Sequence, residues 1–395
     1  MAEPTVRPEG PGSLLALTVV GASATLNLYS TQPLLPLLGR TLGVPPVAAA
    51  LTVSATTVAV ALGSPLAGWL AGRYGRRRTI VAALFALVVP TLLAATSRGI
   101  ADLWAWRFLQ GLAVPGIYAV GIAYATVEWQ AHGVGRAMAS LMTGNVLGGF
   151  LGRLVAATAA ARASWRAAFL ALGAVTLAAA LAVRHWLPPG SDRPGPARSG
   201  PRAGPAGWGW LLEPPLLATL AVGMGTLFTN GAMFTYVTFH LSAPPFSLSV
   251  AAIGWLFAVY LVGAAVLPFL GRWLDELGSR RAVAASTLVT LLGMGLTLLP
   301  SLAAVAAGLV LVSTAAFVAN AAATAHLAVA APPAVRSAAA GAYVSSYYLG
   351  GALGAVLPGA AWHRGGWPAT VAFNAAVLVL ATAGALIHWR RPRVP

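Results

Sequence analysis

One short segment occurs twice in this chain, with its two copies 203 residues apart. The first copy spans residues 65–78 and the second 268–281; a proline, two glycines and the last two arginines recur in register. A second echo keeps nearly the same offset, because residues 147–152 return as residues 349–354. Self-similarity at a fixed period indicates a duplicated architecture. The chain therefore consists of two homologous halves.

Both halves are strongly apolar. Apolar residues make up 58% of the sequence and charged residues 8%, with a mean hydropathy of +0.79, whereas a soluble domain carries about 25% charged residues. A membrane span needs about 20 apolar residues, and we predict an all-α integral membrane fold with twelve transmembrane helices in two pseudo-symmetric six-helix bundles. The predicted spans are residues 13–37, 46–72, 78–97, 100–127, 136–160, 165–187, 214–240, 249–274, 280–299, 301–328, 336–361 and 367–389.

The predicted domains follow from this pattern. An N-terminal bundle occupies residues 1–187, and a C-terminal bundle occupies residues 214–395. Between them, residues 188–213 are rich in Pro, Gly, Ser and Arg, a composition typical of a flexible linker.

The arginines set the expected orientation in the membrane. The formal net charge is +16, but the arginines lie in short clusters between apolar runs, which argues against nucleic-acid binding. With the N-terminus inside, seventeen arginines fall on the cytoplasmic side and five on the outer side. Because positive residues favour cytoplasmic loops, we expect a multi-pass protein of the bacterial cytoplasmic membrane with both termini and the linker in the cytoplasm.

The repeated segment resembles the signature of the major facilitator superfamily between helices 2 and 3. In the first copy its residues are Gly68, Arg73, Gly75, Arg76 and Arg77, and in the second Gly271, Asp275, Gly278 and Arg281. The acidic position of the family is Gly72 in the first copy and Asp275 in the second. The resemblance implies a gating motif in which Glu128, at the end of the fourth predicted span, pairs with Arg76. The alternative is an ordinary positively charged loop.

The fourth predicted span contains an arginine. Arg107, Gln110 and Gly111 resemble the R-x-x-Q-G motif that the family links to proton coupling, and Tyr118 lies on the same helical stripe. An arginine inside a span costs at least ~2.5–3.5 kcal/mol. One reading is a structural arginine bonded to carbonyls of the first or fifth span. The second half has no arginine near residue 310, so we favour a functional role.

Glycines follow a pattern in the fifth span and its repeat in the eleventh. The fifth resembles the family's antiporter motif but lacks its proline, and small residues four apart equally suit a plain helix-packing face. The residues are Gly144, Gly148, Gly149, Gly152, Gly350, Gly351 and Gly354.

Polar and aromatic side chains inside the spans are candidates for a substrate cavity. Each one alone equally suits a hydrogen bond between helices. Besides Arg107, Gln110 and Tyr118, the candidates are Asn27, Tyr29, Gln32, Asn230, Tyr236, Asn320, Tyr343 and Tyr347.

The resemblance covers essentially the whole chain and is nearest to drug:proton antiporters and arabinose-efflux-type permeases. It implies a secondary active transporter that works by alternating access, driven by the proton gradient without a cofactor. None of the eight acids lies at mid-membrane, which favours efflux of a neutral or anionic amphipathic compound over that of a cation.

Two other functions stay open. One is an uncoupled facilitator or importer of a sugar-like solute. The other is an integral membrane enzyme, which the lack of a His/Asp/Glu cluster for catalysis or metal binding disfavours. The expected partners are the lipid bilayer and a small-molecule substrate, with no nucleic acid, and the protein is expected to be a monomer.

Overall fold

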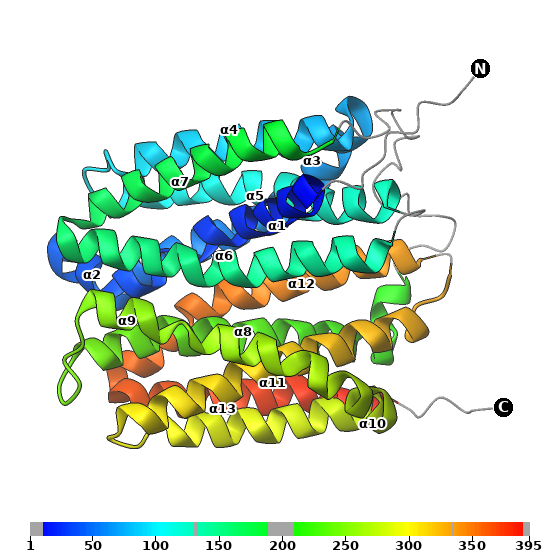
Figure 1. Ribbon diagram of the computed structural model, residues 1–395. Coiled ribbons are helices and arrows are strands. Elements are labelled where there is room, and N and C mark those ends of the chain that lie inside the picture. Colours follow the sequence, from blue (N-terminus) through cyan, green and yellow to red (C-terminus); the bar gives the residue numbers. More distant parts are fainter. Residues whose placement is uncertain (1–10, 130–132, 189–208, 334, 390–395) are drawn as a thin grey trace. The chain divides into compact units, whose positions relative to one another are not determined.

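A computed structural model of the chain describes residues 11–129, 133–188, 209–333 and 335–389 (Figure 1). Within these ranges the side chains of residues 11, 267–275 and 337 are not described. All regular elements of the described part are helices. The chain divides into two compact units: residues 1–200 with 250–255, and residues 201–249 with 256–395. Most of the predicted linker, residues 189–208, lies outside the described residues.

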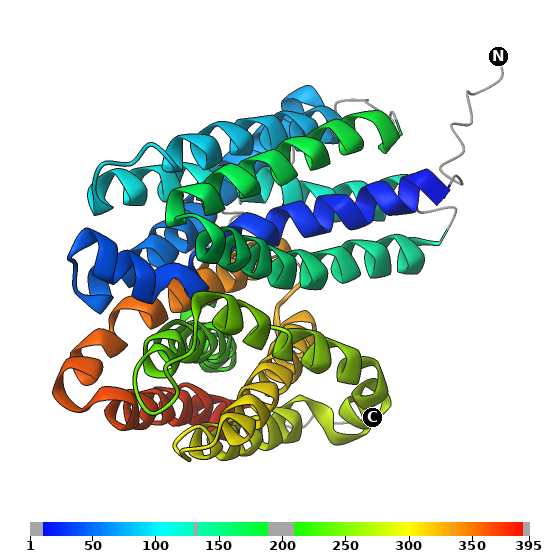
Figure 2. The same cartoon turned by 60° about the vertical axis from the view of Figure 1, so that its left-hand side comes forward.

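The first unit is an all-helical bundle whose long helices run side by side (Figures 1 and 2). Its elements are α1 (Pro11–Leu28), the 3-10 turn η1 (Gln32–Leu34), α2 (Leu35–Leu42), α3 (Pro46–Tyr74), α4 (Arg76–Ala94), α5 (Ile100–Glu128), α6 (Val134–Arg162) and α7 (Trp165–Trp186). The second unit is also a helical bundle. Its elements are η2 (Gly209–Leu212), α8 (Pro214–Ser242), α10 (Val259–Leu296), α11 (Leu302–Ala330), α12 (Arg336–Val356) and α13 (Pro358–His388). Helix α9 (Val250–Leu256) follows α8 in the sequence, and its residues 250–255 belong to the first unit.

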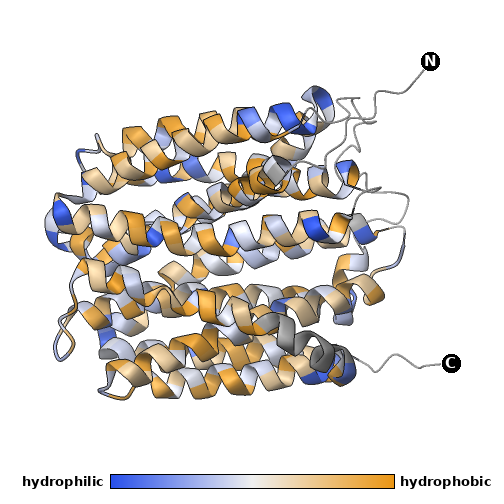
Figure 3. Ribbon diagram, in the orientation of Figure 1, coloured by the Kyte–Doolittle hydropathy of each residue, from blue (hydrophilic) through white to orange (hydrophobic). Residues whose placement is uncertain are grey.

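Helices cover all twelve predicted spans. Eight helical stretches of the described residues are long and apolar enough, by length and composition, to cross a membrane. The other four predicted spans coincide with α6, with α9 and the first part of α10, with the second part of α10, and with α12. In Figure 3 much of the helical ribbon has the colour of hydrophobic residues, and several hydrophilic segments lie near helix ends.

Several boundaries differ from the sequence prediction. The first span is interrupted at residues 29–31, between α1 and η1, where an unbroken helix was expected. The eighth is interrupted at residues 257–258, between α9 and α10. The last helix, α13, includes the end of the eleventh span and is kinked at Gly365 and Gly366 before the twelfth.

The repeated segment forms the same turn in both units. Gly75, between α3 and α4, has a φ of +88°, and Gly278, inside α10, has a φ of +73°. A side chain disfavours this left-handed backbone, so glycine is the residue suited to both positions. The recurring glycine thus reverses the chain at equivalent points of the two halves.

The regularly spaced glycines bring helix backbones into contact. A methyl group added at Gly144, Gly148 or Gly152 of α6 would overlap a backbone carbonyl of α1. The second unit repeats this contact, because methyl groups at Gly350 and Gly354 of α12 would overlap carbonyls of α8. Each unit therefore contains such a seam, α1–α6 or α8–α12, where small residues allow close approach.

We expect Gly148→Ala to destabilise the protein, because its methyl group would overlap the carbonyl of Ala22. Overpacking of this kind costs typically ~1–3 kcal/mol, so the melting temperature in detergent should fall. The matched control is Gly149→Ala on the same turn, whose methyl would come no closer than 3.5 Å to any neighbouring atom. A melting temperature equally low in both variants would show that the α1–α6 seam does not limit stability.

Candidate functional site

The interruption of α1 is held by Arg107 from α5. The last carbonyls of a helix have no amide from a following turn, and in lipid they must find other donors. Arg107 supplies them: its Nη1 donates to the carbonyl of Asn27 at 2.7 Å, and its Nη2 donates to the carbonyl of Leu28 at 2.6 Å. Its Nε donates to the carbonyl of Thr52 on α3 at 3.1 Å. One guanidinium thus ties the end of α1 to α3 and α5.

The carbonyl partners of Arg107 lie on α1, one of the two helices named in the structural interpretation of this arginine, and on α3, which was not named. Its Nη1 also donates to Oε1 of Gln110, so all three of its nitrogens are engaged. The residue is 0% exposed. Neutral oxygens therefore solvate this buried cation. A role in proton coupling stays a prediction.

Threonines extend these contacts into a network that includes α4 and α7. Nε2 of Gln110 donates to the Thr91 hydroxyl at 3.2 Å, and that hydroxyl lies 3.4 Å from Oδ1 of Asn27. Nδ2 of Asn27 donates to the Thr176 hydroxyl at 2.9 Å. We call Arg107, Gln110, Asn27, Thr91 and Thr176 the Arg107 network. Sequence reasoning identified its first three members and missed the two threonines, which have no motif.

A second buried arginine lies beyond the interruption of α1. Arg153 of α6 donates from Nε to Oε1 of Gln32 at 2.8 Å and from Nη1 to the carbonyl of Gly149 at 2.7 Å. Its Cζ lies 5.0 Å from the ring centroid of Tyr29. Two predicted cavity residues, Tyr29 and Gln32, thus share an arginine that was not among the predicted site residues. The signal was a cation within the fifth predicted span.

Tyr118 lies apart from these clusters. Its hydroxyl contacts the sulfur of Met142 on α6 at 3.3 Å. The shared helical stripe therefore does not bring Tyr118 into the hydrogen bonds of Arg107.

In the second unit, one tyrosine–asparagine pair joins two predicted residues, and a second joins the predicted Asn230 to Tyr260, which was not predicted. The Tyr343 hydroxyl donates to Oδ1 of Asn320 at 2.8 Å, and the Tyr347 ring stacks on Tyr343 with centroids 6.1 Å apart. The Tyr260 hydroxyl donates to Oδ1 of Asn230 at 2.5 Å. Asparagine oxygens on α8 and α11 are thus fixed by tyrosines on other helices.

Tyr236 is a fully buried residue of the α8–α12 seam. Its hydroxyl donates to the carbonyl of Ala355 at 3.1 Å, and its ring packs against Phe239 and Trp362. The hydrogen bond from Tyr236 to Ala355 joins α8 to α12, as the alternative interpretation of this residue expects.

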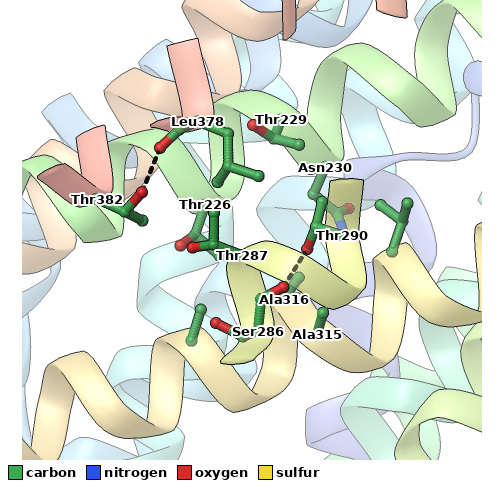
Figure 4. Close-up of a pocket in the computed structure, with 12 residues that line it drawn as sticks. Thr226, Thr229, Asn230, Ser286, Thr287, Thr290, Ala315, Ala316, Leu378 and Thr382 are labelled. Carbon is green, nitrogen blue, oxygen red and sulfur yellow. Dashed lines mark hydrogen bonds between the residues drawn. The ribbon is translucent and has the colours of Figure 1, made fainter. Parts of the chain in front are cut away.

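A small pocket lies between α8, α10, α11 and α13 (Figure 4). Seven of its lining side chains are polar: Thr226, Thr229, Asn230, Ser286, Thr287, Thr290 and Thr382. Most of these hydroxyls donate to carbonyls of their own helices, as Thr226 does to Val222. Thr229 differs, because its hydroxyl is buried without a partner among the described residues. The pocket therefore offers mainly hydrogen-bond acceptors.

Two arginines of the first gating motif, Arg77 and Arg73, contact residues of the first unit. Arg77 donates to the carbonyls of Leu187 at 2.8 Å and Arg184 at 2.9 Å, which ties the start of α4 to the end of α7. Arg73 lies 6.0 Å from the Trp69 ring centroid. Among the described residues, no atom of another helix lies within 4 Å of a methyl group placed at Gly68.

Other expectations for this motif remain predictions. They include the pairing of Arg76 with Glu128. In the second copy Arg281 is exposed, while the side chains at Gly271 and Asp275 lie outside what the structure describes.

The described part of the chain contains no group of three or more His, Asp or Glu side chains that could hold a metal ion. Its polar clusters are instead amides, hydroxyls and arginines inside apolar helices. Two duplicated helical halves with such clusters define a polytopic membrane transporter.

The profile of the Major Facilitator Superfamily matches residues 17–246 and 216–395. The chain therefore belongs to the Major Facilitator Superfamily and is a membrane transporter. This family works without a resident cofactor, in line with the sequence prediction.

Relatives cover most of the chain. It is 32% identical to the inner membrane transport protein YnfM of Escherichia coli (strain K12), over 95% of this chain and 90% of that one. It is 27% identical to the uncharacterized MFS-type transporter YybF of Bacillus subtilis (strain 168), over 70% of this chain and 69% of that one.

Solved structures show the same fold. The nucleoside transporter NupG (D323A mutant) superimposes with a TM-score of 0.78 at 13% identity, covering 95% of this chain and 100% of that one. The human organic anion transporter MFSD10 superimposes with a TM-score of 0.68 at 20% identity, with the same coverage.

We expect Arg107→Lys to lower the melting temperature, because an ammonium cannot replace the planar guanidinium that reaches carbonyls on two helices. Each buried acceptor left unsatisfied costs ~1–3 kcal/mol. Arg107→Ala should be less stable still, whereas Arg162→Lys at the exposed end of α6 should behave as the wild type. If Arg107→Ala melts normally but has lost transport, the residue acts in function rather than in holding α1.

We expect Thr229→Val to leave the melting temperature unchanged or raise it, because valine removes a buried hydroxyl without a partner at nearly constant volume. Thr91→Val is the contrasting variant: it deletes the acceptor of Gln110 and should cost ~1–3 kcal/mol. A clear destabilisation by Thr229→Val would mean that its hydroxyl has a bound partner.

Proposed function

We propose that this transporter exports a neutral or anionic amphipathic small molecule across the cytoplasmic membrane, by alternating access driven by the proton gradient. The observation that carries the proposal is the charge pattern of the spans. Arg107 and Arg153 lie buried within helices, while residues 10–101 and 129–191 contain no Asp or Glu. A site of this composition attracts electron-rich groups and disfavours cations.

The proposal assigns roles to the parts of the chain. Residues 1–187 and 214–395 act as the two bundles of a monomer, joined by a cytoplasmic linker at residues 188–213. Both termini are cytoplasmic, as the arginine distribution favours. Release of an Arg76–Glu128 pair accompanies opening toward the cytoplasm.

Proton coupling rests on the resemblance of Arg107 and Gln110 to the family motif. The hydroxyl-lined pocket between α8, α10, α11 and α13 favours a second candidate function, uncoupled passage of a sugar-like solute, since hydroxyls recognise hydroxyls. The two functions differ in their response to a pH gradient.

The purified protein is reconstituted into liposomes and supplied with neutral, anionic and cationic amphiphiles and with sugars, with and without an imposed pH gradient. We expect gradient-dependent movement of neutral or anionic amphiphiles, which mass spectrometry recovers chemically unchanged. Sugar movement that ignores the gradient would favour the second candidate, and a chemically altered solute would indicate an enzyme. Protein-free liposomes are the control.

A further inference from the structure

Arg107 and Arg153 are buried in the same unit but differ in what holds them. All three nitrogens of Arg107 bond to oxygens of three helices, and the residue is 0% exposed. A solute that reached this guanidinium would have to break the bonds that hold the end of α1. Arg107 is therefore unsuited to bind and release a substrate in each transport cycle.

One contact of Arg153 is open to exchange with an anion, while its Nη1 stays bonded to the Gly149 carbonyl of its own helix. Its Nε bonds to the side-chain amide of Gln32, which sits on the short turn η1, and not to a continuous helix. A carboxylate is a better partner for a guanidinium than a neutral amide, because charge-assisted hydrogen bonds are roughly twice as strong as neutral ones. Replacing the Gln32 oxygen by a carboxylate oxygen is thus favourable for the cation.

The surroundings of Arg153 suit an aromatic or planar solute. The Tyr29 ring lies 5.0 Å from Cζ of Arg153 and is only partly buried, whereas Arg153 is 4% exposed. The cluster therefore joins a buried cation to a partly buried aromatic ring. A carboxylate needs the planar fork of the guanidinium, and the ring offers an apolar face to the rest of the molecule.

The depth of Arg153 makes its charge costly. It lies nine residues, or about 14 Å, along α6 from the exposed Arg162 at the helix end. The sequence supplies no Asp or Glu from residue 129 to residue 191 or from residue 10 to residue 101, so α1 to α4, α6 and α7 cannot provide a carboxylate. An anionic solute would bring the carboxylate that these helices do not supply to the cation.

We propose that Arg153, with Tyr29 and Gln32, forms the subsite that recognises the carboxylate of an organic acid with an aromatic or planar apolar body. This inference rests on the proposed export function and specifies its substrate class. Arg153 is the specificity-determining residue, and Arg107 keeps the supporting role that its four hydrogen bonds define.

The test uses three pairs of probes that differ only in charge: benzoate and benzamide, indole-3-acetate and indole-3-acetamide, and octanoate and octanamide. Binding to the full-length purified protein is measured at neutral pH by thermal shift and titration. We expect the wild type to prefer the aromatic acids to their amides by roughly 10-fold or more, the range for hydrogen bonds to a charged group. The octanoate pair reports whether the aromatic body matters.

The variants separate the subsite from a general effect of charge. Arg153→Gln should abolish the preference for the acids while leaving amide binding in place, and Arg153→Lys should restore it only in part because it lacks the fork. Arg162→Gln removes one exposed arginine from the same helix and should keep the full preference. If Arg153→Gln does not fold, Arg153→Lys and Tyr29→Leu carry the comparison.

Two results would overturn the inference: a wild type with no preference for the acid in any pair, or an Arg153→Gln variant that retains the preference. Export of neutral solutes in the liposome assay would survive either result. Conversely, acid binding that depends on Arg153 in a protein that moves no solute would uphold the subsite and contradict the proposed function.

Discussion

The structure of the first unit depends on one constraint: backbone groups exposed where a helix stops inside lipid must find a partner within the protein. Here the helix that stops is α1, and the partner is the guanidinium of Arg107. Its bonds to the carbonyls of Asn27 and Leu28 make the break stable, and the Arg107 network then fixes α3, α4 and α7 around it. The shape of the bundle core thus follows from a single cation that neutral oxygens solvate.

Beyond the same break, the chain is held by a different arginine. Residues 29–31 place Tyr29 and Gln32 beside Arg153, so the interrupted segment lies between two guanidinium groups on α5 and α6. Arg107 bonds to the backbone carbonyls at the end of α1, whereas Arg153 bonds to the Gln32 side chain beyond the break and to the Gly149 carbonyl of its own helix. That difference separates a supporting role from a recognition role, and it connects the local break in α1 to the proposed selectivity of transport.

The sequence predicted the twelve spans and the two halves because hydropathy and internal repetition are local properties that need no knowledge of packing. It did not predict the break in α1: Tyr29-Ser30-Thr31 is not a helix-breaking run by itself, and the residue that stabilises the interruption is about 80 positions away. For the same reason Thr91 and Thr176 were not predicted, because the role of a threonine in a span depends on its hydrogen-bond partner on another helix. Arg107, Gln110 and Asn27 were identified as candidates, but the hydrogen bonds that join them were not. The unusual position of Arg107 alone could not distinguish a cation that holds the fold from one that binds a solute.

The glycine seams of α1–α6 and α8–α12 also bear on how this gene can change. Glycine codons differ from one another only in the third base, so any other single-base substitution introduces a side chain or a stop signal. At Gly144, Gly148 and Gly152, and at Gly350 and Gly354, even the smallest side chain would overlap a facing carbonyl. These codons therefore tolerate synonymous changes alone, whereas the codon for the neighbouring Gly149 can drift to alanine. Because the two halves arose by duplication, both contain glycines that cannot be replaced without steric overlap. Amino-acid substitutions should therefore be rarer at these five positions than at neighbouring ones.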